Sequence, residues 1–132
     1  MTFAFMLDLS AVSHALRGKG RVAAHLRTHV PSEVCLSAIT LAELRYGADR
    51  RSSAKLHGLI DAFVGDVAVV SFRAPDAVRY GRLAAALGAV GSTLGHFDAL
   101  VAAHALSLGL VLVTSNVRYF ADVPDLRIED WY

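Results

Sequence analysis

Two of three candidate carboxylates in this 132-residue chain lie in its most apolar segments, where a charge is costly to bury without a partner. Asp8 lies in MLDL and Asp98 in FDALVAAHA, and the third acid, Glu43, lies one turn into the helix predicted after residues 34–39. Carboxylates that gather at one place repel each other unless a cation neutralises them. Oxygen ligands without cysteine or paired histidines suit Mg²⁺ or Mn²⁺. These residue types therefore favour a metal site of the kind used in phosphate chemistry.

Each of these polar residues also has a purely structural interpretation. Asp8 could cap the helix that follows it, and Asn116 could cap a short helix in the same way. Thr40 and Glu43 have the T-x-x-E spacing of a capping box, in which the glutamate serves the backbone. Asp98 could complement the dipole at a helix N-terminus. Taken singly these alternatives stay open, and the metal hypothesis rests on the three acids occurring together.

Short apolar runs alternate with longer segments of helical spacing along the chain. The runs are rich in β-branched residues and predict strands buried on both faces of a parallel sheet, at residues 3–7, 34–39, 67–70 and 110–113. The predicted helices cover residues 9–17, 21–29, 40–49, 52–64, 75–90 and 96–108, and Gly109 suits the end of the last one. This alternation predicts an α/β fold with right-handed crossovers.

The polar candidates fall where such a fold binds ligands. In an open parallel sheet, ligands gather outside the carboxyl ends of the strands, where the strand order reverses. Asp8 ends the first strand, and Thr114 and Asn116 follow the strand at residues 110–113. Glu43 and Asp98 each lie near the start of a helix. We therefore expect these residues to converge at one edge of the sheet.

The composition excludes several classes of protein. Hydrophobic residues make up 55% of the chain and charged residues 19%, which excludes disorder and predicts one domain over residues 1–132. No apolar stretch approaches the roughly 18 to 20 residues of a membrane span, so no membrane partner is expected. The first apolar run has no basic region before it and is interrupted by Asp8, as expected of a strand rather than a secretion signal. The single cysteine fits a reducing cytoplasm.

Other sources of chemistry are poorly supported. The chain has no G-x-G-x-x-G, no P-loop and no G-x-S-x-G pattern, which argues against dinucleotide binding, nucleotide binding and a serine hydrolase. His25 and His29 have a zinc-ligand spacing without a third ligand, so we expect a solvated helix face. We expect His104 to be a core residue, and His96 to lie near the acids.

The chain resembles the PIN-domain ribonucleases, and specifically the VapC toxins of bacterial toxin–antitoxin modules. The matching stretches are FMLDLS (5–10), SAITLAELRYGA (37–48), LGHFDALVAAHALSLGLVLVTSNVRYF (94–120) and VPDLRIEDW (123–131). The resemblance implies a three-layer α/β/α fold with a central parallel sheet. It also implies Mg²⁺-dependent endonuclease action on RNA, homodimerisation and inhibition by a VapB antitoxin.

The family's acidic residues carry over to this chain as Asp8, Glu43 and Asp98. Asp8 and Asp98 would bind Mg²⁺, with Mn²⁺ as a substitute, and Glu43 would complete the shell directly or through water. Thr114 and Asn116 would orient the attacking water or the scissile phosphate. Attack by water, and not by the 2′-hydroxyl, would leave 5′-phosphate and 3′-hydroxyl ends.

Two departures from the family pattern bear on the site. The family commonly has Thr-Asn after its first acid, whereas this chain has Leu9 and Ser10, so Ser10 must supply any polar contact there. Asn116 stands where the family often has a fourth acid, so a second metal ion would bind only weakly. Arg17, Arg45 and Arg118 are candidates for phosphate contacts.

One part of the apolar surface on the helices between residues 41 and 59 is expected to bind the antitoxin, and another part is expected to form a two-fold homodimer contact. This surface would comprise Leu44, Tyr46, Leu56 and Leu59, with Arg45, Arg50, Arg51 and Lys55 around it. Two alternatives stay open: a PIN nuclease of RNA processing, and an inactive module that binds RNA or an antitoxin. A phosphoacceptor receiver domain is excluded, because the run at residues 67–70 is not followed by an aspartate and the C-terminal LRIEDW has no lysine.

Overall fold

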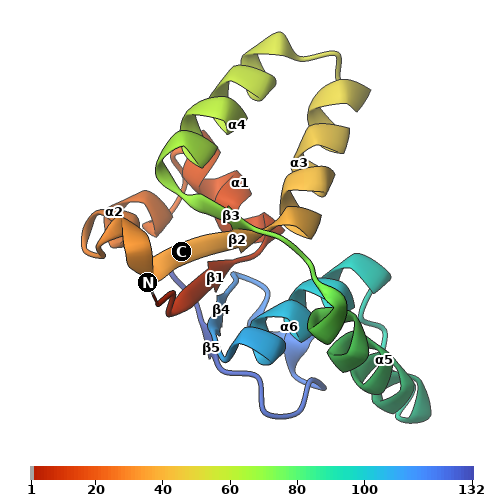
Figure 1. The fold of residues 1–132 in the computed structure, drawn as a ribbon. Helices are drawn as coiled ribbons and strands as arrows, with labels where there is room; N and C mark the ends of the chain where they lie inside the picture. Colours follow the sequence, from red (N-terminus) through yellow and green to blue (C-terminus); the bar gives the residue numbers. More distant parts are fainter. Residues whose placement is uncertain (1) are drawn as a thin grey trace.

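The computed structural model describes residues 2–132, and within them a five-stranded parallel sheet forms the centre of the protein (Figure 1). The strands are β1 (Phe5–Leu7), β2 (Val34–Ser37), β3 (Ala68–Val70), β4 (Val111–Val113) and β5 (Ile128–Glu129). Their order across the sheet is β3-β2-β1-β4-β5, and every neighbouring pair is parallel. The strand order therefore reverses at β1, between β2 on one side and β4 on the other.

Six α-helices connect these strands within the same residues: α1 (Leu9–Arg17), α2 (Val22–Arg27), α3 (Ala38–Arg50), α4 (Ala54–Asp66), α5 (Ala74–Ala89) and α6 (His96–Leu108). Short 3₁₀ turns occur at Pro31–Glu33 and Val117–Phe120. Helix α6 ends as predicted, with Gly109 in the left-handed conformation at φ +69°. None of the helices in residues 2–132 is both long enough and apolar enough to cross a bilayer.

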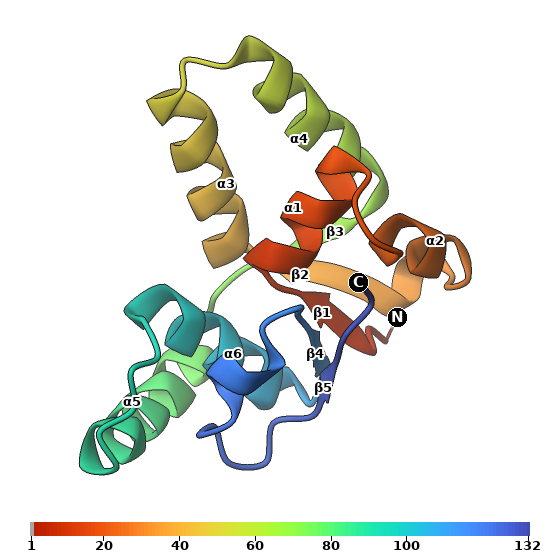
Figure 2. The same cartoon turned by 180° about the vertical axis from the view of Figure 1, so that it is seen from behind.

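The helices cover both faces of the sheet and create two cores. Helices α5 and α6 lie on one face and α1, α2 and α4 lie on the other, as Figures 1 and 2 show from opposite sides. Successive residues of a central strand point to opposite faces. Met6 and Leu112 pack in the core beneath α5 and α6, whereas Leu7 and Val113 pack in the core beneath α1 and α4. The predicted α/β/α arrangement around a parallel sheet is confirmed.

The outer strands differ from the prediction. The run at residues 67–70 was expected to be buried on both faces, but Ala68 and Val69 are exposed because β3 is an edge strand. Strand β5 was not predicted, since it has only two residues and one of them is the charged Glu129. The predicted strand at residues 34–39 ends at Ser37, because the side chain of Ser37 caps α3 by accepting the Ile39 N–H at 3.0 Å.

A buried polar chain joins three elements that meet under the sheet. The fully buried imidazole of His104 on α6 has its Nδ1 2.9 Å from the hydroxyl of Ser37. Its Nε2 lies 3.5 Å from the buried carboxylate of Asp76, near the start of α5. Burial lowers the pKa of His104, against the opposing charge of Asp76. His104 is thus the core residue that the sequence predicted.

The hydrogen bonds assign the proton of this histidine. The Asp76 carboxylate can only accept, so the Nε2 atom that faces it carries the proton of the neutral imidazole, and Nδ1 accepts the hydroxyl proton of Ser37. If His104 were protonated, its Nδ1 would donate to the Ser37 oxygen instead of accepting from it. The buried hydroxyl proton of Ser37 would then have no acceptor.

We expect acid to destabilise the fold through His104. Its pKa is lower in the folded state than the value of about 6.5 of an unfolded histidine, so the unfolded chain takes up the proton first. The stability from neutral His104 is complete above about pH 6.5 and is lost as the pH falls below it. Between about pH 6.5 and 5 the free energy of unfolding should fall by up to ~1.4 kcal/mol per pH unit more steeply than in His104→Gln.

The measurement is urea unfolding at several pH values, with His96→Gln as the control. His96 is an exposed histidine outside the core, so this variant controls for the removal of one histidine from the chain. Equal slopes for wild type and His104→Gln would contradict the assignment of a neutral, buried His104.

Candidate active site

A cavity of about 410 Å³ opens at the carboxyl ends of β1 and β4, where the strand order reverses. Asp8, Glu43 and Asp98 all line it, although they come from three different elements. The expected convergence at one edge of the sheet is therefore what the structure has. Asn116 lines the same cavity, while Thr114 lies buried behind it.

Asp8 combines the two roles proposed for it. It directly follows β1 and caps α1, because its Oδ1 accepts the Ala11 N–H at 2.9 Å and the Ser10 hydroxyl at 2.7 Å. Burial raises the pKa of its carboxyl, and hydrogen bonds from Ser10 and Thr114 oppose this rise. The capping interpretation is correct, yet it leaves a buried carboxylate facing the cavity.

Glu43 does not serve a helix cap. Helix α3 starts at Ala38 and is capped by Ser37, so Thr40 lies inside the helix and the capping-box interpretation is wrong. The Oε1 atom of Glu43 is buried and has no hydrogen-bond partner in the part of the chain that the structure describes. Burial raises the pKa of Glu43, and the charges of Asp98 and then Asp8 raise it further.

Asp98 lies in the first turn of α6, as expected of an acid that complements the helix dipole. Burial and the charge of Asp8 raise its pKa, and a hydrogen bond from Tyr119 lowers it. No three side chains of His, Cys, Asp or Glu among residues 2–132 stand close enough together to hold one metal ion jointly. The three carboxylates interact through their charges and share one cavity.

Ser10 supplies the polar contact that the sequence demanded beside Asp8. Its hydroxyl donates to Asp8, lies 3.3 Å from the Thr114 hydroxyl and accepts the Ser115 N–H at 3.1 Å. Thr114 is fully buried and accepts the Asn116 N–H at 3.0 Å. These bonds join the end of β1 to the segment after β4. The Asn116 side chain makes no capping bond to the turn at Val117–Phe120, so that interpretation is wrong.

One wall of the cavity was missed by the sequence analysis. Ser10, Ser13, His14 and Arg17 of α1 all line the cavity. They follow one another at intervals of three, one and three residues, the spacing that places side chains on one helix face. The opposite face of α1 carries buried Ala11 and Val12. This polar stripe was the signal in the sequence that could have identified Ser13 and His14.

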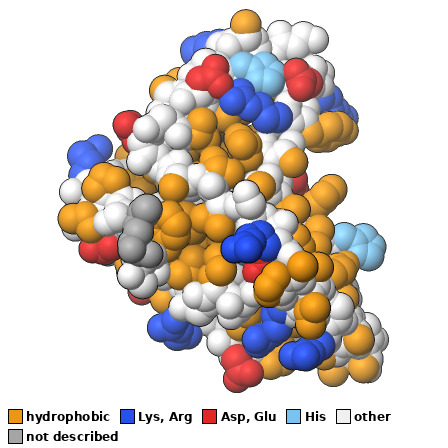
Figure 3. Space-filling view, viewed as in Figure 1, with side chains coloured by type: hydrophobic (Ala, Val, Ile, Leu, Met, Phe, Trp, Pro, Cys, Tyr) orange, Lys and Arg blue, Asp and Glu red, His pale blue; other side chains and the backbone are white. Residues whose placement is uncertain are grey.

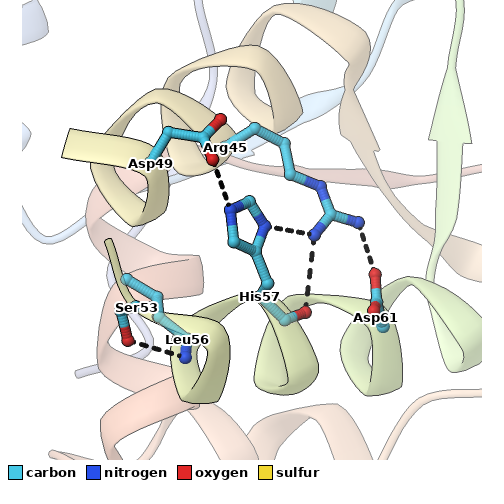
Figure 4. Close-up of polar contacts among 6 residues, drawn as sticks. All are labelled: Arg45, Asp49, Ser53, Leu56, His57 and Asp61. Carbon is cyan, nitrogen blue, oxygen red and sulfur yellow. Dashed lines mark hydrogen bonds and ion pairs between the residues drawn. The ribbon is translucent and has the colours of Figure 1, made fainter. Parts of the chain in front are cut away.

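The candidate phosphate contact Arg45 is engaged elsewhere. Its guanidinium contacts His57 Nδ1 at 3.0 Å and forms an ion pair with Asp61, and His57 in turn contacts Asp49 (Figure 4). Figure 3 shows charged and histidine side chains gathered at the outer end of α3 and α4, away from the sheet. Arg45 thus joins the two helices. Arg17 lines the cavity, and Arg118 is exposed and does not.

Three other histidines, His25, His29 and His96, do not line the cavity. His96 is exposed. His25 and His29 both stack on the Trp131 ring, with centroid distances of 5.2 and 4.9 Å, and His29 also contacts Glu33 at 3.0 Å. The expected solvated face at His25 and His29 is instead half buried against an aromatic ring.

Comparison with known proteins agrees with this architecture. The PIN domain model matches residues 5–126. The chain is 34% identical to the tRNA(fMet)-specific endonuclease VapC of Salmonella typhimurium over 131 residues, covering 96% of this chain and 97% of that protein. It is 31% identical to Ribonuclease VapC2 of Haemophilus influenzae over 128 residues, with the same coverage of 96% and 97%.

Solved structures are similar over nearly the whole chain. The DNA-bound VapBC complex of Salmonella typhimurium contains a chain that matches with a TM-score of 0.93 and 32% identity, covering 99% of this chain and 100% of that one. VapBC2 of Rickettsia felis, bound to a DNA fragment from its promoter, matches with a TM-score of 0.92 and 27% identity, covering 98% and 100%.

The chain belongs to the PIN-domain family of nucleases. Within that family it groups with the VapC ribonucleases, which it matches from end to end. The resemblance seen in the sequence is confirmed, and so is the assignment to a class of RNA-hydrolysing enzymes.

Replacing Glu43 by glutamine should separate activity from stability. Because the pKa of Glu43 is raised in the fold, its ionised form destabilises the protein above that pKa, so Glu43→Gln should raise the melting temperature at pH 7 in EDTA. Loss of the charge should lower RNase activity by at least about 100-fold, beyond the 10- to 100-fold typical of outer-shell partners. Asp61→Asn is a control at an exposed acid outside the cavity. An active Glu43→Gln enzyme would assign the residue a structural role.

Proposed function

We propose that the chain is the toxin of a type II toxin–antitoxin module, acting as a Mg²⁺-dependent endoribonuclease on RNA phosphodiester bonds. The observation that carries this proposal is the convergence of Asp8, Glu43 and Asp98 on one cavity at the switch point of the sheet. Relatives named as VapC ribonucleases support the activity, and solved VapBC complexes support the toxin assignment.

The residues of the cavity fit a divalent metal ion. Burial and neighbouring carboxylates raise the pKa of Glu43 and that of Asp98. The buried Oε1 atom of Glu43 has no hydrogen-bond partner among residues 2–132, so a cation would relieve a cost that the protein bears. Mg²⁺ is usually bound by one or two carboxylates together with water. Asp8 and Asp98 would hold the ion, and Glu43 would act directly or through water. When bound, the ion acidifies water and stabilises charge on the phosphate.

The protein's own residues would position the substrate. Arg17, on the α1 wall of the cavity, would contact a phosphate of the RNA. Asn116 would orient the attacking water or the scissile phosphate, and buried Thr114 would hold the Asn116 backbone in place. Attack by water on the phosphorus, with the P–O3′ bond breaking and the 3′-oxygen leaving, would give a 5′-phosphate and a 3′-hydroxyl. A transfer RNA is the proposed substrate class, because the Salmonella typhimurium relative is named as a tRNA(fMet)-specific endonuclease.

Metal removal tests this mechanism. EDTA should abolish cleavage of total RNA by the purified chain, and excess Mg²⁺ or Mn²⁺ should restore it. Asp98→Asn keeps the size of the side chain and removes its charge, so it should lower cleavage by at least about 100-fold and abolish growth inhibition while the fold is kept. Mapping of the 5′ ends identifies the RNA. Cleavage that persists in EDTA would refute the metal mechanism, and a protein that binds RNA without cutting it would be the inactive module.

An apolar groove beside the cavity suits the antitoxin. A cavity of about 250 Å³ between α1, α3 and α4 is lined by residues that include Leu9, Leu16, Leu44 and Leu56. Ser13, Arg17 and Glu43 line both this groove and the acidic cavity. An amphipathic VapB segment could bury its apolar face in the groove and place a basic side chain at the acids. Tyr46 and Leu59, expected in this surface from the sequence, are exposed outside the groove.

A second apolar surface supports the proposed homodimer. Val78 of α5, the C-cap residue Val90 of that helix and Phe97 of α6 are more than half exposed, and Figure 3 shows hydrophobic side chains gathered over the α5 end of the protein. Burying them against a second copy would remove apolar surface from water. The single cysteine, Cys35, is buried, and burial raises its thiol pKa to about 12, which fits the proposed cytoplasmic location.

Two glycines provide a matched test of the groove. Gly47 lines the groove and Gly58 lies on α4 outside it, and a Cβ at either position meets no atom within 4 Å. Gly47→Leu should fill the groove and weaken antitoxin binding by at least about 10-fold, the equivalent of 1.4 kcal/mol, whereas Gly58→Leu should bind normally. Both changes remove a glycine from a helix and should preserve the fold.

The measurement is co-expression with the small gene next to this one, followed by calorimetric titration of the two purified proteins. Wild type expressed alone should arrest growth, and co-expression should restore it. Gly47→Leu should stay toxic during co-expression. Rescue of Gly47→Leu to the level of Gly58→Leu would place the antitoxin elsewhere on the surface.

A further inference from the structure

Tyr119 holds the start of α6 from outside the helix. It lies in the turn Val117–Phe120, and its hydroxyl oxygen accepts the Gly95 N–H at 2.9 Å. Gly95 is the N-cap residue of α6, whose first turn contains Asp98. A Cβ placed on Gly95 would stand 3.3 Å from the Tyr119 hydroxyl and 3.6 Å from Oδ2 of Asp98. The phenol and the carboxylate therefore both lie beside Gly95.

The hydrogen-bonding capacity of the Tyr119 phenol determines which group its hydroxyl can donate to. A tyrosine hydroxyl has one proton to donate and accepts through its oxygen. Since the oxygen accepts the Gly95 N–H, the proton of the hydroxyl is available to the neighbouring Asp98 carboxylate.

We propose that Tyr119 is a positioning residue of the metal site, whose hydroxyl fixes the Asp98 carboxylate to the N-terminus of α6 in the orientation that binds the ion. This inference rests on the proposed function, in which Asp98 is a metal ligand. Outer partners of this kind orient a ligand, and their loss typically weakens metal binding or activity by 10- to 100-fold.

The position of Tyr119 allows its hydroxyl to be removed without disturbing the fold. The side chain is 40% exposed, and its ring packs edge-on against buried Phe120 with a centroid distance of 5.7 Å. Tyr119→Phe keeps this ring contact and removes only the oxygen that joins Gly95 to Asp98. The carboxylate then keeps its charge and its place on α6 but loses its fixed orientation.

The experiment measures Mn²⁺ binding to the full-length protein by electron paramagnetic resonance, without RNA. Tyr119→Phe should raise the Mn²⁺ dissociation constant by about 10-fold or more. Tyr80→Phe, a half-buried tyrosine on α5 outside the cavity, is the matched control and should bind as wild type does. Melting temperatures of both variants should stay within about 2 °C of wild type.

Two further variants decide between the remaining outcomes. Gly95→Ala reaches the same pair from the other side, since its methyl group would press on the Tyr119 hydroxyl, and it should also weaken Mn²⁺ binding. Asp98→Asn tests the proposed function itself. If Asp98→Asn loses Mn²⁺ binding while Tyr119→Phe and Gly95→Ala bind normally, Tyr119 does not position the ligand. If Asp98→Asn binds Mn²⁺ as wild type does, the metal assignment of the cavity fails, and this inference fails with it.

Discussion

The mutual repulsion of three carboxylates in one cavity is the constraint that the rest of this structure must withstand. Asp8, Glu43 and Asp98 each have a raised pKa, for which burial is the main cause, with neighbouring charge contributing at Glu43 and Asp98. In this fold the three acids lie on or next to three separate elements, and the parallel sheet holds these elements together. Because β1, α3 and α6 are each anchored in a core, the acids cannot separate to relieve the repulsion.

Hydrogen bonds from the surrounding chain restrain the acids unequally. Asp8 is held by the Ser10 hydroxyl and the Ala11 N–H, and Asp98 has the phenol of Tyr119. Glu43 has one oxygen that is buried and has no hydrogen-bond partner among residues 2–132. Leaving a buried polar atom unpaired costs about 1–3 kcal/mol or more. This cost supports the proposal that Glu43 contacts a metal ion directly or through water.

The central elements could be predicted from sequence because their signals are local. Helices α1 and α6 start and end at the predicted residues, and the runs that form β1 and β4 are apolar enough to identify buried strands. The position of β3 was predicted, but neither its exposure nor the existence of β5 could be, since exposure and pairing depend on the place of a strand in the sheet. The helix cap shows the same limit: Thr40 and Glu43 have the right spacing, but the chain begins α3 earlier, at Ser37. The three acids could be identified by residue type and the α1 wall by its polar stripe, whereas the role of Tyr119 depends on which segments meet in the fold.

The same surface serves both proposed partners of the protein. Ser13, Arg17 and Glu43 belong at once to the acidic cavity and to the apolar groove between α1, α3 and α4. A segment bound in the groove would therefore compete for contacts that RNA needs, even before any of its side chains reached the acids. The apolar groove would supply affinity, since burial of apolar surface is the main favourable term in association. Because the groove shares its polar residues with the acidic cavity, a segment bound in the groove would also block the cavity. Inhibition of the nuclease would then need no change in its fold.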